Sequence, residues 1–164
     1  MKLIPLIALL AAVPLCSCEQ QANGQTPAKA KPAATGTVAA SAGRLVLPAV
    51  KGRPGAAYLT LANRGIAAVT VVSLSIDRAG RAEIHRTQGG TMTPVERLEV
   101  APGTSARFKP GGLHVMVFGL DPKLQAGGKA ELTVTFANGK TLKTPLAVVP
   151  PGGAMEGMDH GDMH

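Results

Sequence analysis

Short runs of alternating apolar and polar residues, separated by Gly and Pro, fill the middle of the chain. Alternation with a period of two is typical of half-buried β-strands, and no run here keeps the 3.6-residue period of an amphipathic helix. Many short strands joined by turn residues are typical of an antiparallel sandwich or barrel, so we predict an all-β domain. The predicted strands cover residues 45–48, 56–62, 68–76, 81–86, 95–100, 104–108, 113–120, 129–136 and 141–149.

Two of the breaks between these runs have the composition of tight turns. Asn138-Gly139 separates two alternating runs, and an Asn-Gly pair favours a two-residue hairpin because both residues tolerate positive φ. The Gln-Gly-Gly-Thr segment at residues 88–91 is a second reversal. We expect this hairpin to bring Met92 back beside His85.

The first 18 residues are predicted to be an export signal. Lys2 precedes an apolar run over residues 3–15, which is too short to span a bilayer as a mature helix. The run ends in Leu-Cys-Ser-Cys at residues 15–18, which resembles a bacterial lipobox with Cys18 as the lipidated residue. The alternatives are ordinary signal cleavage, which leaves Cys18 as a free thiol, and a Cys16–Cys18 pair in an uncleaved chain. With lipidation, we expect an exported periplasmic lipoprotein held at the membrane.

The composition divides the rest of the chain into three parts. Residues 19–43 are rich in Gln, Ala, Pro, Thr and Gly, with few side chains large enough to anchor a core, which predicts a disordered linker. The β domain is predicted to cover residues 44–149. Residues 150–164 begin with Pro-Pro-Gly-Gly and are predicted to be a flexible tail.

The chain is basic, with a formal net charge of +7. Nucleic acid is a poor explanation for this charge, because the protein is predicted to be exported and has three Phe, one Tyr and no Trp to stack on bases. An acidic protein partner, an anionic lipid surface and ordinary solvated charges all stay open. Because aromatic residues are scarce, Val, Leu, Ile and Ala must fill the core, and we expect Tyr58 to join them there.

Imidazoles and thioethers recur between residues 85 and 116. His85 and Met92 are followed, after 21 intervening residues, by His114 and Met116. Residues i and i+2 of a strand point to the same side and lie roughly 6.6 Å apart, so His114 and Met116 share one face. Soft thioethers combined with imidazoles favour Cu(I), which makes these four residues the predicted metal ligands. Glu83 shares the face of His85 and is a potential hydrogen-bond acceptor for it, although such a carboxylate is more often simply solvated, and we leave it out of the ligand set.

These residues resemble the periplasmic copper(I) chaperones, small secreted proteins associated with copper delivery to cytochrome oxidase. The order of the His and Met residues carries the resemblance, together with flanking segments at 57–63, 82–85, 92–95 and 109–116. The resemblance covers about residues 44–149 and implies a cupredoxin-like Greek-key β-barrel. Six residues separate His85 from Met92, about four fewer than is usual in that family, and an even difference keeps the same faces inward.

The tail, residues 150–164, also contains His and Met residues, which interleave there with three carboxylates. Clusters of this kind commonly bind metal, and the carboxylates and imidazoles also suit Cu(II). A harmless polar tail is the alternative. The candidate secondary ligands are Met155, Met158, His160, Met163 and His164.

The sequence contains no recognisable catalytic constellation, so we expect a carrier rather than an enzyme. The prediction is a copper chaperone that binds Cu(I) in the folded domain and delivers it outside the cytoplasm. The expected recipient is a copper-accepting partner, such as cytochrome oxidase or one of its assembly factors. The alternatives are a cupredoxin-like redox module and a structural surface lipoprotein with incidental metal binding.

Overall fold

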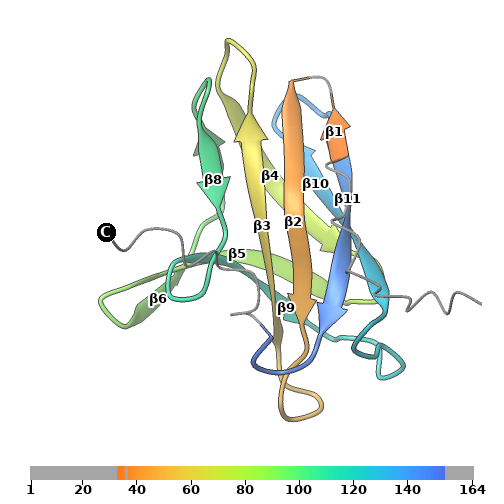
Figure 1. Cartoon of the computed structure of the whole chain (residues 1–164). Helices are drawn as coiled ribbons and strands as arrows, with labels where there is room; N and C mark the ends of the chain where they lie inside the picture. Colours follow the sequence, from red (N-terminus) through yellow and green to blue (C-terminus); the bar gives the residue numbers. More distant parts are fainter. Residues whose placement is uncertain (1–32, 36, 154–164) are drawn as a thin grey trace, which may run out of the picture.

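Seven strands close into a mixed β-barrel in the computed structural model, which describes residues 33–35 and 37–153 (Figure 1). Neighbouring strands pair antiparallel around the barrel except β11 and β2, which run parallel. The pairing of β2 with β3 closes the circle. In spatial order the barrel strands are β2 (Val38–Val46), β11 (Thr141–Val149), β10 (Lys129–Phe136), β4 (Val69–Ile76), β5 (Arg81–Gln88), β9 (Leu113–Phe118) and β3 (Gly55–Asn63).

Four short strands extend the barrel at its margins, and each pairs with one barrel strand. They are β1 (Ala33–Thr35) beside β2, β6 (Thr91–Pro94) beside β5, β7 (Leu98–Val100) beside β4, and β8 (Ser105–Arg107) beside β3. The hairpin of β5 and β6 projects from the side of the barrel (Figure 1). None of the described segments forms a helix with the length and hydropathy needed to cross a bilayer.

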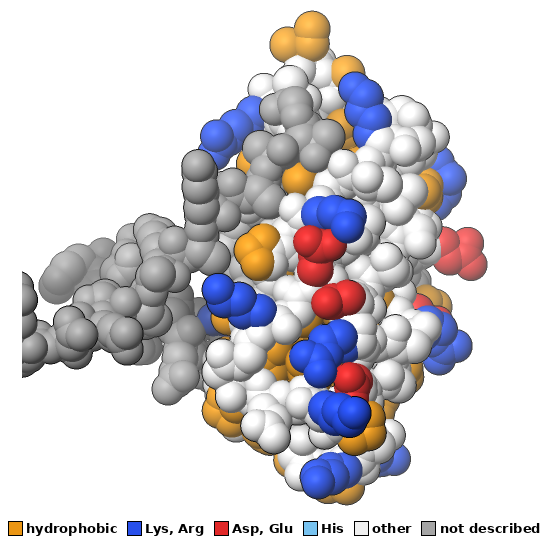
Figure 2. All heavy atoms as spheres, turned by 90° about the vertical axis from the view of Figure 1, so that its right-hand side faces the viewer, with side chains coloured by type: hydrophobic (Ala, Val, Ile, Leu, Met, Phe, Trp, Pro, Cys, Tyr) orange, Lys and Arg blue, Asp and Glu red, His pale blue; other side chains and the backbone are white. Residues whose placement is uncertain are grey.

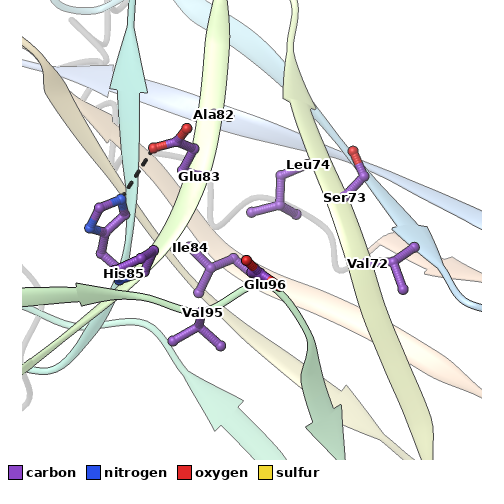
Figure 3. A pocket seen from close by; sticks show the side chains of 10 residues that line it. Val72, Ser73, Leu74, Ala82, Glu83, Ile84, His85, Val95 and Glu96 are labelled. Carbon is purple, nitrogen blue, oxygen red and sulfur yellow. Dashed lines mark hydrogen bonds and ion pairs between the residues drawn. The ribbon is translucent and has the colours of Figure 1, made fainter.

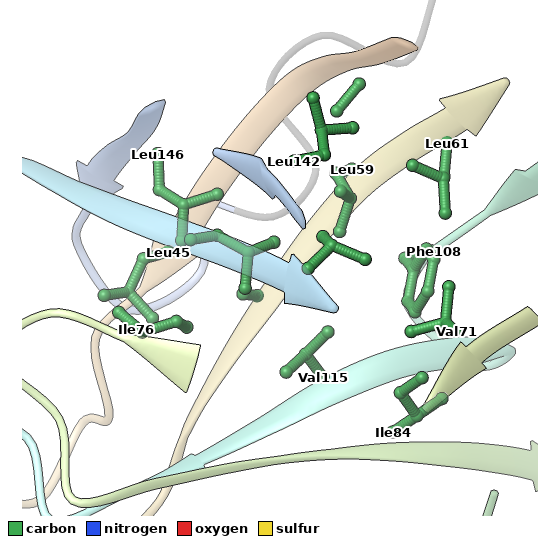
Figure 4. Packing of buried hydrophobic residues seen from close by; sticks show 14 of the residues in the cluster. Leu45, Leu59, Leu61, Val71, Ile76, Ile84, Phe108, Val115, Leu142 and Leu146 are labelled. Carbon is green, nitrogen blue, oxygen red and sulfur yellow. The ribbon is translucent and has the colours of Figure 1, made fainter. Parts of the chain in front are cut away.

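Alternation along the strands fills the core with aliphatic side chains (Figure 4). In β10 the buried residues Leu132 and Val134 alternate with half-buried threonines, and in β11 Leu142 and Leu146 alternate with exposed positions. Burying one Leu or Val side chain contributes about 1.5–3 kcal/mol, so these inward-facing residues stabilise the barrel. The expected all-β barrel is confirmed, and Val, Leu, Ile and Ala make up most of its core, which Phe108 and Phe136 join.

Strand β4 pairs with β7 through its first three residues and forms only one ladder pair with β5, Leu74 with Ala82. A cavity of about 440 Å³ opens in the resulting gap. It is lined by residues of β4 and β5, by Pro94 at the end of β6, and by the two residues that follow it. One barrel seam is therefore hollow, and it adjoins the strand that carries His85.

Most predicted strands appear with small boundary changes, and β10 and β11 have the predicted limits. Two expectations are wrong in detail. The predicted strand at 95–100 is only Leu98–Val100, because the chain leaves β6 at Pro94 before it joins β4. Tyr58 points away from the core and is half-buried, because Ala57 and Leu59 occupy the inward positions of β3.

The predicted linker, residues 19–43, also ends too late. Strand β2 begins at Val38, whose backbone pairs with Asn63, and β1 lies at Ala33–Thr35. A register shift after Ser41 hides the strand pattern, since Ala42 has a φ of 53°. The predicted signal peptide with Cys18 and the predicted metal-binding residues of the tail lie outside the described residues.

Charged side chains of both signs are interspersed on the face seen in Figure 2. One ion pair joins two neighbouring barrel strands, with Nζ of Lys143 on β11 2.8 Å from Oε1 of Glu131 on β10. This contact raises the pKa of Lys143, chiefly through its hydrogen bond to the carboxylate. Mixed charge on this face favours ordinary solvation there over a continuous basic surface.

Candidate metal centre

Strand register places the four predicted ligands on one outer face of the β6–β5–β9 sheet. His85 of β5 is directly opposite His114 of β9, and Glu83 is opposite Met116. Met92 of β6 is opposite Thr87, which lies two residues after His85 and therefore on the same face. The two imidazoles form the middle row of this face, with Met116 and Met92 in the rows on either side.

Each strand turns its other face to the core. Val115 and Val117 of β9 are fully buried. Ile84 of β5, which lies between Glu83 and His85 in the sequence, is also buried. Because side chains alternate, these apolar contacts fix the outward direction of His114 and Met116. The predicted alternation of residues 113–117 is therefore confirmed.

The two imidazole rings lie close enough to share one ion. Their centroids are 6.1 Å apart, with an angle of 36° between the ring planes. A metal–imidazole bond is about 2.0–2.1 Å long for a metal such as zinc, so one ion fits between rings at this separation. His114 is 6% exposed and the His85 side chain 16%, so both rings are largely shielded from water.

A backbone carbonyl orients the ring of His114. Its Nδ1 lies 2.9 Å from the carbonyl oxygen of Gly112, which also accepts a hydrogen bond from the amide of Thr87. A carbonyl only accepts hydrogen bonds, so Nδ1 carries the proton and Nε2 keeps the lone pair that a metal needs. The bend that precedes β9 thus prepares His114 as an Nε2 donor.

His85 has one partnered and one unpartnered ring nitrogen. Its Nε2 lies 3.3 Å from Oε2 of Glu83 (Figure 3). Its Nδ1 is buried and has no hydrogen-bond partner in the structure. An unsatisfied buried polar atom costs about 1–3 kcal/mol, and a bound metal ion would satisfy this one.

The two thioethers differ in exposure. Met116 is half-buried, whereas Met92 is 49% exposed near the end of the projecting hairpin. The turn between β5 and β6 is made by Gly89 and Gly90, with φ values of 57° and 80°. The expected hairpin is confirmed, although Pro94, not Met92, is the residue opposite His85.

The donor set on this face is two imidazoles with two thioethers. The described part of the chain has no group of three or more His, Cys, Asp and Glu side chains that could hold a metal ion. Glu83 and His85 also line the cavity beside β4, together with Glu96 and apolar residues (Figure 3). The candidate site thus lies between the cavity beside β4 and the exposed hairpin of β5 and β6.

Two contributors to this geometry stand outside the predicted ligand set. Glu83 contacts His85 directly. The sequence signal for this contact is that Glu83 lies two residues before His85 in the same strand. The carbonyl of Gly112 carries no sequence signal, because any residue offers the same backbone oxygen. The local bend at residues 109–112, with its hydrogen bond from the Gly112 amide to the Lys109 carbonyl, brings that oxygen to His114.

Comparison with known proteins gives one matching family and two related sequences. The family model of LpqE-like putative lipoproteins matches residues 38–148. Putative lipoprotein Lxx21020 of Leifsonia xyli subsp. xyli (strain CTCB07) is 30% identical over 154 residues, which cover 91% of this chain and 89% of that protein. An uncharacterised protein of Rickettsia prowazekii (strain Madrid E), RP573, is 35% identical over 86 residues, 49% of this chain and 46% of that one.

Solved structures share the fold. The copper-bound PCuAC domain from PmoF2 superposes with a TM-score of 0.64 at 17% identity, covering 74% of this chain and 99% of that domain. The solution structure of Cu(I)-DR1885 from Deinococcus radiodurans gives a TM-score of 0.56 at 26% identity, covering 78% of this chain and 85% of that protein. These similarities support the β-barrel fold independently of the strand pattern.

Proposed function

We propose that this chain, which belongs to the LpqE-like family of putative lipoproteins, is a copper chaperone that binds Cu(I) through His85, Met92, His114 and Met116. One observation carries the proposal: two shielded imidazoles face each other, one with a buried unpartnered nitrogen, and thioethers lie in the rows on both sides. The structures that share this fold include a copper-bound domain and a Cu(I) protein, which supports copper as the cargo.

The donor chemistry favours Cu(I) and its release. Thioether and neutral imidazole are soft to borderline donors that prefer Cu(I) to hard cations. Both cysteines of the chain lie before residue 19, so the barrel itself contributes no thiolate that would retain the ion. A partner with a thiolate-bearing site could therefore take the copper by ligand exchange, beginning at Met92, the most exposed of the four ligands.

The proposed location of the protein and its proposed copper acceptor rest on its membership of this family. The family description and the Leifsonia relative both carry the word lipoprotein, which supports export and anchoring of this chain through Cys18. The copper acceptor would then be an extracytoplasmic protein, such as cytochrome oxidase or one of its assembly factors. We further propose that Met155, Met158, His160, Met163 and His164 form a second site that also accepts Cu(II).

An anaerobic Cu(I) competition titration tests this function on the mature chain and on a chain that ends at Val149. We expect the shorter chain to retain one Cu(I) and the mature chain to bind additional copper. The double substitution Met92→Leu, Met116→Leu should weaken Cu(I) binding to the shorter chain by about tenfold or more, equivalent to 1.4 kcal/mol. Leu is close to Met in volume, so stability should change by less than about 1.5 kcal/mol.

Thr93→Val is the matched control, because Thr93 is an exposed neighbour of Met92 on the same strand and points to the opposite face. It should leave copper binding unchanged. Copper binding that survives the double Met substitution would contradict the proposal and favour incidental binding elsewhere. An intense visible absorption band in the copper-loaded protein would instead favour a redox module with a thiolate ligand.

A further inference from the structure

A chain of polar contacts runs along the outer face of β5 and ends at His85. Arg81, Glu83 and His85 occupy alternate positions, so all three side chains share this face. Nε of Arg81 lies 3.2 Å from Oε1 of Glu83, while Oε2 of the same carboxylate lies 3.3 Å from Nε2 of His85. The Arg81 guanidinium in turn lies over the ring of Phe118, 4.4 Å from its centroid. Glu83 is therefore held from both sides.

This contact decides which nitrogen of His85 carries the proton. An ionised carboxylate only accepts hydrogen bonds, so the His85 nitrogen beside Glu83 must be the donor. In a neutral imidazole the other nitrogen then keeps its lone pair. That nitrogen, Nδ1, is the buried atom without a partner.

The opposite ring has the reverse arrangement. His114 donates from Nδ1 to the carbonyl of Gly112 and keeps its lone pair on Nε2. The two facing imidazoles thus present different nitrogens, Nδ1 from His85 and Nε2 from His114. Each is fixed by an acceptor of a different kind, a carboxylate in one case and a backbone carbonyl in the other.

We propose that Glu83 is a positioning residue that holds His85 as its Nε2–H tautomer, so that His85 binds the metal through Nδ1 while His114 binds it through Nε2. The inference rests on the proposed copper-binding function. Glu83 acts through the imidazole and is not itself a ligand. Acceptors of this kind fix ring orientation and raise the basicity of the ligating nitrogen, and their loss typically costs about 10–100-fold in metal affinity.

The metal-free protein provides the first test, through long-range ¹H–¹⁵N correlation spectra of the histidine side chains in the chain that ends at Val149. We expect His85 as the Nε2–H tautomer and His114 as the Nδ1–H tautomer. In Glu83→Ala, the His85 signals should move toward a mixture of tautomers. The His114 signals should stay unchanged, which makes the second ring an internal control.

Cu(I) binding provides the second test, since Cu(I) is diamagnetic and leaves the spectra readable. Addition of Cu(I) should shift Nδ1 of His85 and Nε2 of His114. Glu83→Ala should weaken Cu(I) binding by about 10–100-fold, and Glu83→Gln, which keeps an acceptor oxygen, should lose less. Glu96→Ala is the matched control: Glu96 lines the same cavity but makes no hydrogen bond or ion pair with His85 or His114, so affinity should be unchanged.

The two hypotheses fail in different ways. A Cu(I)-induced shift at Nε2 of His85, or an Nδ1–H tautomer in the metal-free protein, overturns the role of Glu83 and leaves copper binding intact. Equal affinities for Glu83→Ala and Glu96→Ala also overturn it. A wild-type chain that binds no Cu(I) at its two histidines overturns the proposed function and this inference together.

Discussion

At the scale of single residues, the imidazole partners decide what the proposed site can do. His114 is oriented by a backbone carbonyl, which no side-chain substitution removes, whereas His85 depends on the side chain of Glu83. The two histidines should therefore differ in their sensitivity to substitutions of neighbouring residues. The thioethers differ in another respect, because Met92 is exposed and Met116 is half-buried.

Tyr58 provides a spectroscopic test of its own half-buried position on β3. Burial raises the pKa of its hydroxyl, while the nearby Arg44 guanidinium lowers it by a smaller amount. The chain has one Tyr and no Trp, so ultraviolet absorbance follows this group alone. We expect the folded protein to titrate above pH 10 and the urea-unfolded protein near the ordinary value of about 10.

The sign of the linked stability follows directly. Because the pKa of Tyr58 is higher in the folded than in the unfolded protein, its contribution to stability is fully present at a pH below the unfolded-state pKa. The contribution is lost as the pH rises through the folded-state pKa. The Arg44→Gln substitution removes the lowering charge and should raise the pKa of Tyr58 further. A fall in that pKa in Arg44→Gln would contradict the assigned cause.

At the scale of elements, the β5–β6 hairpin carries Met92 to the site. Its turn residues Gly89 and Gly90 have positive φ, and no atom lies within 4 Å of a Cβ built at either position. A substitution there therefore tests backbone conformation without steric overlap. The same turn fixes the register in which Met92 faces Thr87.

We predict that Gly90→Ala lowers the free energy of unfolding by about 1–2 kcal/mol, because the left-handed conformation is less favourable by this amount for an L-residue. Gly90→Asn should cost clearly less, since Asn adopts that region more readily. Urea unfolding of the three proteins measures both values. Equal stability of the Ala variant and the wild type would show that the turn does not need this φ.

At the scale of the whole molecule, β2 closes the barrel by pairing with β11 on one side and β3 on the other. Its first residues, Val38, Ala39 and Ala40, are buried, and they lie before the predicted start of the domain at residue 44. The first half of the ladder between β2 and β3 therefore comes from a segment whose composition resembles a linker.

Two truncations test this boundary. A chain that begins at Arg44 should lose about 3 kcal/mol or more of folding free energy, because it loses the buried Val38 side chain and the ladder pairs of residues 38–41 with β3. A chain that begins at Thr37 keeps this ladder and serves as the control. Thermal unfolding distinguishes them, and equal midpoints would show that residues 38–43 add nothing to the fold.

The sequence by itself determined the features that depend on local periodicity and turn chemistry. Alternation over residues 129–136 and 141–149 gave β10 and β11 with their limits, and the Gly-Gly turn gave the β5–β6 hairpin. The same alternation placed His114 and Met116 on the face opposite Val115, because side chains two residues apart in a strand must point the same way.

Only the tertiary structure decided the features that depend on partners distant in the chain. Val38 is in a strand because β3 offers it a ladder partner, Asn63, and the barrel interior buries its side chain, although its neighbours are small residues with little strand preference of their own. Tyr58 is outside the core because its two neighbours take the inward positions. The approach of His85 to His114, and with it the distance of Met92 from His114, follows from how β5 aligns with β9. The physical reason is that the pairing register of strands distant in the chain is set by long-range packing, whereas side-chain face, turn and hairpin register are set by adjacent residues.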